Sequence, residues 1–391
     1  MSRPGARRRP PRVIHIVESL DVGAVEGWLL RMLRAGGKWG ADLDWTFYTV
    51  LQRPGRFDEA AREMGARVIN SPVALDDKIN FTRALRRELK RGKYDVLHCH
   101  HDVVSAVYLL AAAGLPISNR IVHVHNADLH VPTGNPRKSA LLREPMRRLC
   151  LLLGNRIVGI SGYTLDNFLS NRSRKPRRDV VLYYGIDTAP YHTVTQSRAA
   201  LRASLDMPEN ARILLFAGRM VEYKNPLFVL DLLDEIAEEE PDAYAVFAGA
   251  GPLEDKVRER AQWLGIEERV RVLGWRDDTI ALMQGADVLV FPRVEEITAD
   301  VGREGLGLVV VEAQAAGLPS LLSRGIPQDA IVHTQLCDTV PLADGPKAWG
   351  ARARSIFAAP RPDRALALAA IEKSEFALEA GFRNLIALHR V

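Results

Sequence analysis

The chain has 391 residues, and 47% of them are hydrophobic, which is enough apolar material for two cores and predicts two domains. The formal net charge of +5 could suggest a nucleic-acid or membrane partner. However, residues 1–12 contain five arginines and no acid, and the rest of the chain holds 48 basic and 48 acidic residues. The balanced charge of this larger part argues against nucleic acid as a partner.

Residues 1–12 are also rich in proline and lack the apolar stretch of a secretory signal, so we expect a disordered basic tail. No segment approaches the roughly 18 to 20 uninterrupted apolar residues of a membrane-spanning helix. Cys99, Cys150 and Cys337 are odd in number and far apart, which indicates neither a disulfide framework nor a Cys-rich metal site. Together these features predict a soluble, cytoplasmic protein.

Along the rest of the chain, short apolar runs alternate with helical patterns, which predicts parallel sheets covered by helices on both faces. The expected strands are residues 13–17, 45–50, 96–98, 121–124, 157–160 and 180–183 in the first half, and 213–216, 244–247, 270–273, 288–291 and 320–322 in the second. We expect two doubly wound, Rossmann-like α/β domains, with a boundary in the range 191–208. They would span residues 13–195 and 196–371, followed by a helical segment at 372–391.

The loop after the first strand carries Gly23, Ala24 and Glu26. Gly23 could let the backbone approach a ligand. Glu26 could contribute to the same site or could cap a helix over residues 27–33, and we favour the capping role.

Histidines are concentrated where the next strands end: His98, His100 and His101 follow one another closely, and His123 and His125 follow the next strand. The spacing His-x-His places each pair on one face of a strand, and two such pairs could bind zinc. We favour hydrogen-bonded structural histidines at His98, His100 and His123 over metal ligation.

Two basic segments, residues 137–153 and 172–178, could face anionic lipid. Pro145 interrupts the first segment, and its apolar end at 149–153 fits a core position better. Peripheral membrane contact is therefore an alternative that we do not favour. The sequence does not indicate an oligomeric state.

In the second half, Arg219 and Lys224 lie five residues apart in a loop after an expected strand. A planar guanidinium and a mobile ammonium group suit neighbouring phosphoryl groups, so this pair is a candidate diphosphate clamp. Gly218 lies in the same loop and is a further candidate ligand contact. Two more strand-end loops carry candidate contacts, at Gly249 and Gly251 in one and at Arg276 in the other. Each of these loops taken singly could be an ordinary turn.

The run from Glu304 to Glu312 places two carboxylates eight residues apart across a glycine-rich helix start. The backbone N–H groups there could bind phosphate, and they belong to Gly305, Leu306, Gly307 and Leu308. Carboxylates repel phosphate, so Glu304 and Glu312 would instead accept hydrogen bonds from hydroxyl groups on either side. Diol, pyrophosphate and diol together describe a nucleotide sugar. The alternative is a capped amphipathic helix with two solvated glutamates.

These motifs, in this order and spacing, resemble the retaining nucleotide-sugar glycosyltransferases of family 4, whose hallmark is a Glu, seven residues and a second Glu. The resemblance covers nearly the whole chain from Val13 onward. It implies the GT-B architecture, with two Rossmann-like domains facing across a cleft and a last helix that packs back on the first, acceptor-binding domain. It also implies that Glu304 contacts the donor sugar and that Glu312 holds the ribose.

By the same resemblance, Arg219 and Lys224 would clamp the donor diphosphate, and His125 with Asn126 would orient the sugar and the phosphate. The reaction would transfer a sugar from a nucleoside diphosphate sugar, with UDP favoured, to an acceptor hydroxyl with retention of configuration. The family uses no metal, and we expect no cofactor besides the donor. The leaving phosphate would take the acceptor proton.

The chain departs from the family at Ala24, which replaces a second glycine, and at residues 183–187, where the family more often has Pro-Asn-Gly. A longer loop at 293–303 carries Glu295, Glu296 and Asp300. This loop could attract a cationic acceptor such as an amino sugar or an aminocyclitol, but we favour a solvated loop. A polysaccharide precursor is another candidate acceptor.

Two other functions fit the same architecture, namely a sugar-nucleotide epimerase and a non-catalytic sugar-nucleotide binder. The epimerases rely on carboxylate acid–base groups for which the sequence has no specific motif.

Overall fold

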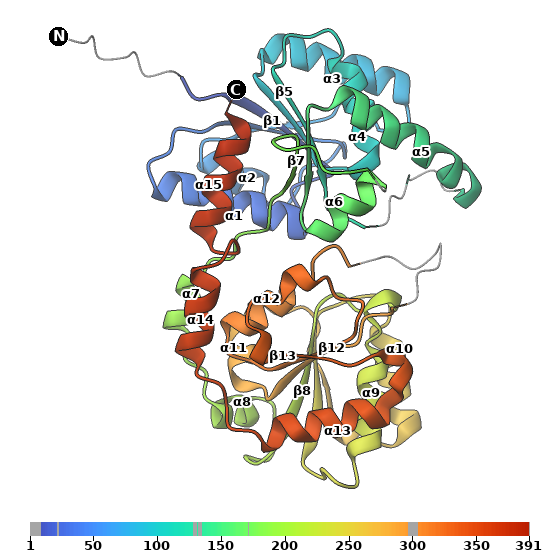
Figure 1. The fold of residues 1–391 in the computed structure, drawn as a ribbon, viewed down its shortest axis with the longest axis vertical. Coiled ribbons are helices and arrows are strands. Elements are labelled where there is room, and N and C mark those ends of the chain that lie inside the picture. The colour runs from blue at the N-terminus through green and yellow to red at the C-terminus, as the bar shows by residue number, and fades with distance from the viewer. Residues whose placement is uncertain are drawn as a thin grey trace, which may run out of the picture. The chain divides into compact units, whose positions relative to one another are not determined.

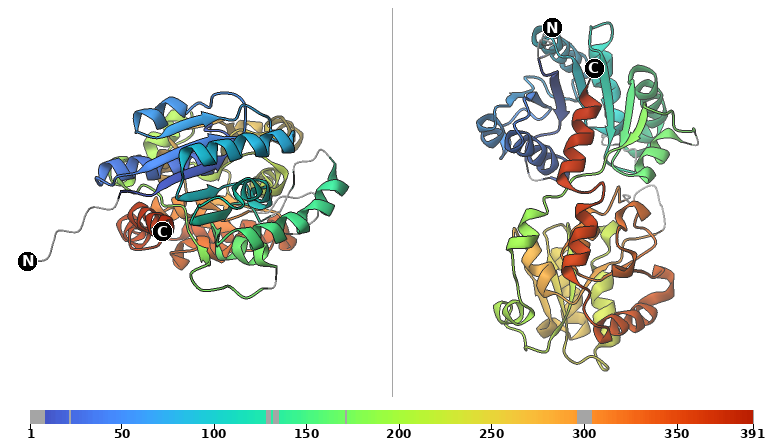
Figure 2. Two further views of the ribbon diagram at one scale, coloured as in Figure 1. Left: turned by 90° about the horizontal axis from the view of Figure 1, so that it is seen from above. Right: turned by 60° about the vertical axis from the view of Figure 1, so that its left-hand side comes forward.

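The computed structural model describes residues 9–21, 23–127, 131, 135–170, 172–295 and 304–390. The chain packs as two compact units (Figures 1 and 2). The first unit runs to Gly185 and includes the residues from Leu378 onward, and the second is Ile186–Ala377. The chain therefore enters the second unit ten residues before the expected boundary at 195, and α7 (Ala189–Thr193) and α8 (Arg198–Ser204) both belong to that unit.

The first unit contains a seven-stranded, entirely parallel sheet in the order β3-β2-β1-β4-β5-β6-β7. Its strands are β1 (Arg12–Val17), β2 (Asp44–Thr49), β3 (Arg67–Asn70), β4 (Val96–Cys99), β5 (Asn119–Val124), β6 (Arg156–Gly159) and β7 (Asp179–Val181). Its helices are α1 (Ala24–Lys38), α2 (Asp58–Glu63), α3 (Lys78–Gly92), α4 (Ser105–Ala112), α5 (Pro136–Leu153), α6 (Gly162–Leu169) and α15 (Leu378–His389). The sequence did not predict β3, a four-residue edge strand.

Alternation along the strands gives this sheet two different faces. One face presents Ile14, Leu97 and Val122 to a core that includes α3, α4 and α5, which pack side by side. The other face presents His15, His98 and His123, which are all fully buried. On that side α1 packs against α15, the last helix of the chain.

The second unit contains a six-stranded parallel sheet in the order β10-β9-β8-β11-β12-β13. Its strands are β8 (Arg212–Ala217), β9 (Ala243–Ala248), β10 (Val270–Val272), β11 (Val288–Phe291), β12 (Ser320–Leu322) and β13 (Cys337–Thr339). Besides α7 and α8, its helices are α9 (Leu227–Ile236), α10 (Glu254–Leu264), α11 (Thr279–Gly285), α12 (Leu308–Ala315), α13 (Gly345–Ala358) and α14 (Arg364–Glu372). The three-residue edge strand β13 was also not predicted.

The central strands of this second sheet are buried on both faces, as in β8, where Leu214, Leu215 and Phe216 are at most 1% exposed. Helices α9, α10 and α13 form one covering layer, and α8, α11, α12 and α14 form the other. The prediction of two doubly wound α/β domains is therefore confirmed.

The predicted disordered tail, residues 1–12, includes too many residues. Its last residues are held by contacts with the first unit. Arg9 pairs with Asp95 at 2.8 Å, and Arg12 begins β1. Arg12 donates its backbone N–H to Asp95, also at 2.8 Å, and its side chain pairs with Asp44 at 2.9 Å. Residues 1–8 lie outside the described residues.

Candidate functional site

At the carboxyl edge of the second sheet, two strand-end loops lie in direct backbone contact. Gly218 and Gly249 follow β8 and β9 with φ angles of 139° and 143°, and Gly218 N–H donates to the Ala248 carbonyl at 2.8 Å. A Cβ atom on Gly249 would lie 2.0 Å from the Gly218 oxygen, and one on Gly251 would lie 2.3 Å from the Met220 oxygen. Gly249 and Gly251 are therefore required by the packing of these loops, independently of any ligand.

The close approach of these loops positions Lys224, the last residue of the short 3-10 helix Glu222–Lys224. Lys224 Nζ lies 3.6 Å from Glu304 Oε2, and both side chains are 15% exposed. Nζ also lies 5.3 Å from the centre of the Phe291 ring, at the end of β11. The structure thus brings together two predicted site residues that are 80 positions apart in the sequence.

Glu304 also interacts with the start of α12. Its Oε1 accepts a hydrogen bond from Gly307 N–H at 3.2 Å, whereas Oε2 is buried and has no hydrogen-bond partner among the described residues. Gly307 caps α12 with a φ of 81°, a conformation that favours glycine. One of the amides expected to bind phosphate is therefore occupied by a carboxylate in this structure.

The other predicted residues of the second unit differ in their surroundings. Arg219 is exposed, and its guanidinium has no hydrogen-bond or ion-pair partner within the described part of the chain. Arg276 is also exposed, but it pairs with Asp278 at 2.5 Å, which raises the pKa of the guanidinium. Glu312 lies in the second turn of α12 and is half-buried.

For the acidic loop after β11, the sequence suggested either a solvated loop or a site for a cationic acceptor. The contacts of Glu295 fit neither interpretation. Its Oε1 accepts hydrogen bonds from the backbone N–H groups of Arg324 at 2.8 Å and Leu342 at 3.0 Å. Glu295 therefore fastens this loop, through one carboxylate oxygen, to the segments that follow β12 and β13. Glu296 and Asp300 lie outside the described residues.

In the first unit, the loop after β1 leads directly into a helix. Gly23 is the N-cap of α1 with an extended φ of −159°, and Ala24 is the first helical residue, so the alanine fits without strain. The carboxylate of Glu26, in the first turn, folds over Gly23, where an added Cβ would lie 2.1 Å from Oε2. Burial, together with the negative charges of Glu18 and Asp21, raises the pKa of Glu26 to about 7. Glu26 can therefore be protonated near neutral pH, which the sequence did not reveal.

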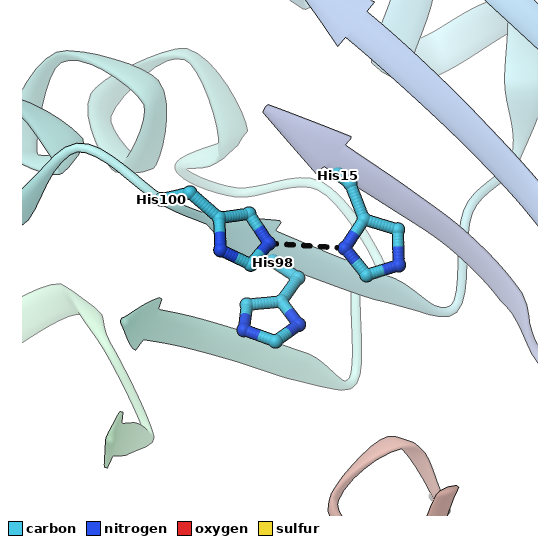
Figure 3. A group of neighbouring side chains, drawn as sticks. All are labelled: His15, His98 and His100. Carbon is cyan, nitrogen blue, oxygen red and sulfur yellow. Dashed lines mark hydrogen bonds between the residues drawn. The ribbon is translucent and has the colours of Figure 1, made fainter. Parts of the chain in front are cut away.

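The histidine face of the first sheet holds two chains of hydrogen-bonded rings. Figure 3 shows three of these rings, His15, His98 and His100, and the bond between His15 and His100. In the first chain, His15 pairs with His100 at 3.0 Å, His100 pairs with His125 at 3.0 Å, and His125 pairs with Tyr184. In the second, His98 pairs with His389 of α15 at 3.0 Å and with His123 at 3.1 Å.

Burial lowers the pKa of every histidine in these two chains, to about 3 for His125 and His389. The rings are therefore neutral at physiological pH, and each has one N–H group and one lone pair. Because every His–His bond needs one of each, the tautomer of one ring fixes that of the next. The tautomer of His125 therefore depends on His100 and His15.

His125 is held from both its side chain and its backbone. Both ring nitrogens have partners within the protein, and the residue is 7% exposed. Its backbone N–H donates to Asp102 at 2.7 Å, and the other oxygen of Asp102 accepts from the Asn126 side chain at 2.8 Å. Asp102 was missed by sequence reasoning, although an acid just after a His-x-His-His run was a usable signal.

Two sets of three rings have nitrogens within 4.8 Å of one another: His15, His98 and His100, and His100, His123 and His125. Imidazole nitrogens are good ligands for transition metals. Here, however, these nitrogens form the His–His hydrogen bonds, which a metal ion would have to replace. The geometry favours a network of neutral rings.

Residues 27–190 match the model of Glycosyltransferase Family 4, and residues 197–339 match that of Glycosyl transferases group 1. The chain carries two glycosyltransferase domains. After these matches we call the first unit the family 4 domain and the second unit the group 1 domain. The first contains the histidine network, and the second contains Lys224 and Glu304.

Relatives and solved structures agree with this assignment. EpsF of Bacillus subtilis (strain 168), provisionally named as a glycosyltransferase, is 28% identical over 90% of this chain and 89% of its own. An Escherichia coli enzyme, UDP-Gal:alpha-D-GlcNAc-diphosphoundecaprenol alpha-1,3-galactosyltransferase, is 24% identical over 68% of this chain and 67% of its own. The crystal structure of Anabaena HepE with UDP and glucose superposes with a TM-score of 0.75 at 16% identity, covering 96% of this chain and 98% of HepE.

The structural likeness confirms the expected GT-B fold class for these glycosyltransferase domains. Among the described helices, none combines the length and the apolar character needed to cross a membrane.

The packing of the group 1 domain predicts the effect of Gly249→Ala. The new Cβ would overlap the Gly218 carbonyl, at a φ that disfavours alanine, so we expect a loss of about 2 kcal/mol or more in the free energy of unfolding. Urea unfolding measures this. The matched control is Gly37→Ala in α1, where the added Cβ meets nothing within 4 Å and alanine favours the helix. Equal effects in the two variants would contradict the close loop packing.

The histidines of the family 4 domain predict acid lability. Seven of them have a lowered folded pKa, including His101 at about 4, whereas the unfolded value is about 6.5. Below pH 6.5 the unfolded state binds more protons, so their stabilisation is present above pH 6.5 and is lost as the pH falls. Each histidine contributes about 1.4 kcal/mol per pH unit. Glu26 opposes this trend. Because its pKa is higher in the folded state, the folded state takes up its proton first, and this stabilises the fold as the pH falls below 7.

Urea midpoints at pH 7.5, 6.5 and 5.5 measure this effect. His389→Gln should reduce the slope below pH 6.5 by about one proton. Midpoints that do not change with pH would rule out a network of neutral histidines.

Proposed function

We propose that this protein is a retaining glycosyltransferase that moves a sugar from a nucleoside diphosphate sugar, with UDP favoured, to an acceptor hydroxyl, without a metal ion or other cofactor. A cytoplasmic location is part of the same proposal. The observation that carries it is the Lys224–Glu304 pair at the carboxyl edge of the group 1 sheet, beside the start of α12. In open α/β sheets, this edge is where ligands bind.

The charges at this edge suit the departure of a diphosphate. Arg219 is exposed and lacks a partner for its guanidinium among the described residues, and Lys224 provides a mobile ammonium group. Together they would stabilise the negative charge that develops as the bond to the anomeric carbon breaks. The remaining amides at residues 305–308 would contribute through the start of α12.

The two glutamates would hold the hydroxyl groups of the donor. Glu304 Oε2 is buried without a hydrogen-bond donor in the described structure, so a sugar hydroxyl would complete its hydrogen bonding. Glu312 lies two turns further along α12 and would bind the ribose. In this proposal, the leaving phosphate takes the acceptor proton on the same face, which retains the configuration.

His125 would then act mainly as a positioning residue, because both of its ring nitrogens are already engaged. It would fix the loop that ends at Asn126 and the ring of Tyr184. Gly23 and Glu26 would lie at the corresponding edge of the family 4 sheet.

UDP is favoured as the donor nucleotide by two similar proteins. The Escherichia coli relative is named for UDP-Gal, and the HepE structure contains UDP and glucose. With Glu295 engaged by backbone amides, a cationic acceptor would have to rely on Glu296 and Asp300. A hydroxyl of a polysaccharide precursor is therefore the preferred acceptor class, ahead of an amino sugar or an aminocyclitol.

An assay of the whole chain with UDP-sugars and a panel of hydroxyl acceptors tests the function. We expect a glycosylated product with the anomeric configuration of the donor, and the same rate in the presence of EDTA. An isomerised nucleotide sugar would instead indicate the epimerase, and binding without turnover would indicate a binding protein. Activity that EDTA removes and zinc restores would contradict the metal-free mechanism.

The proposed roles at the donor site can be separated by substitution. Lys224→Met should cut kcat by about a hundredfold or more, because it removes charge stabilisation of the transition state. Glu304→Gln should mainly lower kcat, whereas Glu312→Gln should mainly weaken donor binding, because ribose contacts are common to the ground and transition states. Initial rates measured over a range of donor concentrations separate kcat from donor affinity and so distinguish these effects. Equal losses of affinity in both glutamate variants would refute the division of roles.

A further inference from the structure

The group 1 domain has a polar cavity at the edge of its sheet opposite to Lys224 and Glu304. A cavity of about 310 Å³ is lined by Arg212, the first residue of β8, and by residues that immediately precede β11, β12 and β13. The C-terminal half of α13 and the segment 359–362 complete its wall. Because all six strands are parallel, this is the amino edge of the sheet, and Lys224 and Glu304 lie beyond the carboxyl edge. The six residues of β8 separate the two edges by roughly 20 Å.

The cavity has an excess of positive charge. Four arginines line it, Arg198, Arg212, Arg352 and Arg361, and a fifth, Arg202, lies buried beside Arg198. The carboxylates of the wall are Asp287 and Asp338. Five guanidinium groups against two carboxylates leave three positive charges at this one place.

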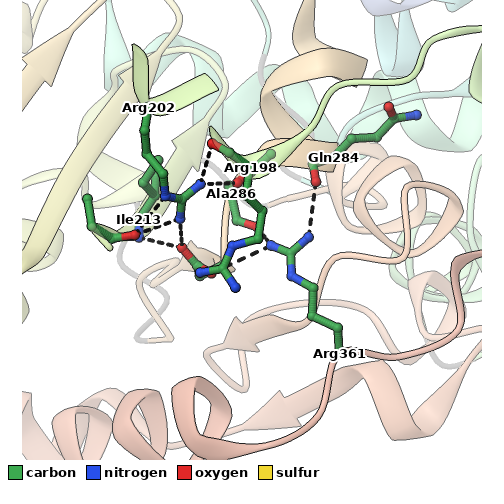
Figure 4. Close-up of polar contacts among 9 residues, drawn as sticks. Arg198, Arg202, Ile213, Gln284, Ala286 and Arg361 are labelled. Atoms are coloured by element: carbon green, nitrogen blue, oxygen red, sulfur yellow. Dashed lines mark hydrogen bonds and ion pairs between the residues drawn. The ribbon is translucent and has the colours of Figure 1, made fainter. Parts of the chain in front are cut away.

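Asp287 is shared by three arginines, Arg198, Arg202 and Arg361. Figure 4 shows the guanidinium groups of these three arginines close together. The two carboxylate oxygens form ion pairs with Arg198 and Arg202, and Arg361 lies 3.6 Å from the oxygen that pairs with Arg198. Asp287 also accepts the backbone N–H of Ile213 at 2.8 Å. A single, 7% exposed carboxylate therefore cannot neutralise the guanidinium groups gathered around it.

The excess of positive charge also affects the pKa values of two arginines in the cluster. Burial lowers the pKa of Arg361 and of Arg202, and although Asp287 opposes this, repulsion from the neighbouring arginines lowers both further. Added negative charge would relieve this repulsion.

Arg212 is the arginine of the wall that is best placed to accept a ligand. Its side chain is half-exposed, and within the described residues it has no hydrogen-bond or ion-pair partner, only a contact with the Phe357 ring at 6.0 Å. Arg352, by contrast, is already paired with Asp338. The planar donors of guanidinium groups match the oxygens of phosphate groups.

We propose that this cavity is a binding site for a small phosphate-bearing anion, separate from the donor site. Arg212 and Arg198 contact the anion at the mouth of the cavity. Arg202 and Arg361, fixed by backbone carbonyls and Asp287, supply the fixed positive charge behind them. The bound anion stabilises the group 1 domain without entering the catalytic edge.

Calorimetric titration of the full chain with inorganic pyrophosphate, at constant ionic strength, tests the proposal. Pyrophosphate also fits the donor site, so we expect two anions per chain. Arg212→Gln should weaken one of the two binding events about tenfold or more and leave the other intact, because it removes charge-assisted hydrogen bonds. Arg219→Gln should have the reverse effect. Arg212→Lys should restore part of the lost affinity.

Arg258→Gln, on the exposed surface of α10, is the charge-matched control and should leave both events unchanged. Thermal unfolding of each variant without ligand establishes that it folds. A single anion per chain that is lost in Arg219→Gln and retained in Arg212→Gln would overturn the proposal. The absence of any pyrophosphate binding would overturn it as well.

Discussion

Parallel strand pairing is the constraint on which both domains depend. In each sheet, every strand runs in the same direction, so the loops that follow the strands gather at one edge and the residues that precede them gather at the other. Residues distant in sequence therefore meet at the carboxyl edge, as Lys224 and Glu304 do. The same geometry collects the arginines of the cavity at the amino edge. One topological rule thus creates two chemically different places in one domain, one with a carboxylate beside an ammonium group and one dominated by guanidinium groups.

The first sheet uses its two faces differently. One face is an ordinary apolar core, and the other buries imidazoles that must satisfy one another because water is excluded. Trp28 contributes to this arrangement by stacking on Tyr184 at 5.0 Å and meeting His123 edge-on at 5.4 Å. Such a face gives less hydrophobic stabilisation than leucine or valine would, but it specifies one arrangement of rings, because each hydrogen bond has a defined donor and acceptor.

The sequence predicted what local patterns encode and missed what depends on distant partners. Alternating apolar runs were sufficient for eleven strands, but β3 and β13 are too short and polar for periodicity to reveal. The sequence pointed to Lys224 and Glu304 as site residues, yet only the fold shows that they meet. Glu295 was misread because its backbone partners lie 29 and 47 residues away. The role of His389 in the network gives no local signal, since its partner His98 is 291 positions distant. The return of the last helix to the first domain was available only through resemblance to a family.

The position of α15 also determines which parts of the chain the first domain needs to complete its fold. Two residues of α15 bind strands of the first domain: His389 pairs with His98, and the Leu388 carbonyl accepts a hydrogen bond from the Asn119 side chain. In the sequence, the entire second domain lies between these strands and α15. His98 therefore has no His389 partner until residues that follow the whole second domain have been added to the chain. The second domain, continuous in sequence, can complete its core earlier. The domain whose residues come first in the sequence thus needs residues from beyond the second domain to complete its fold.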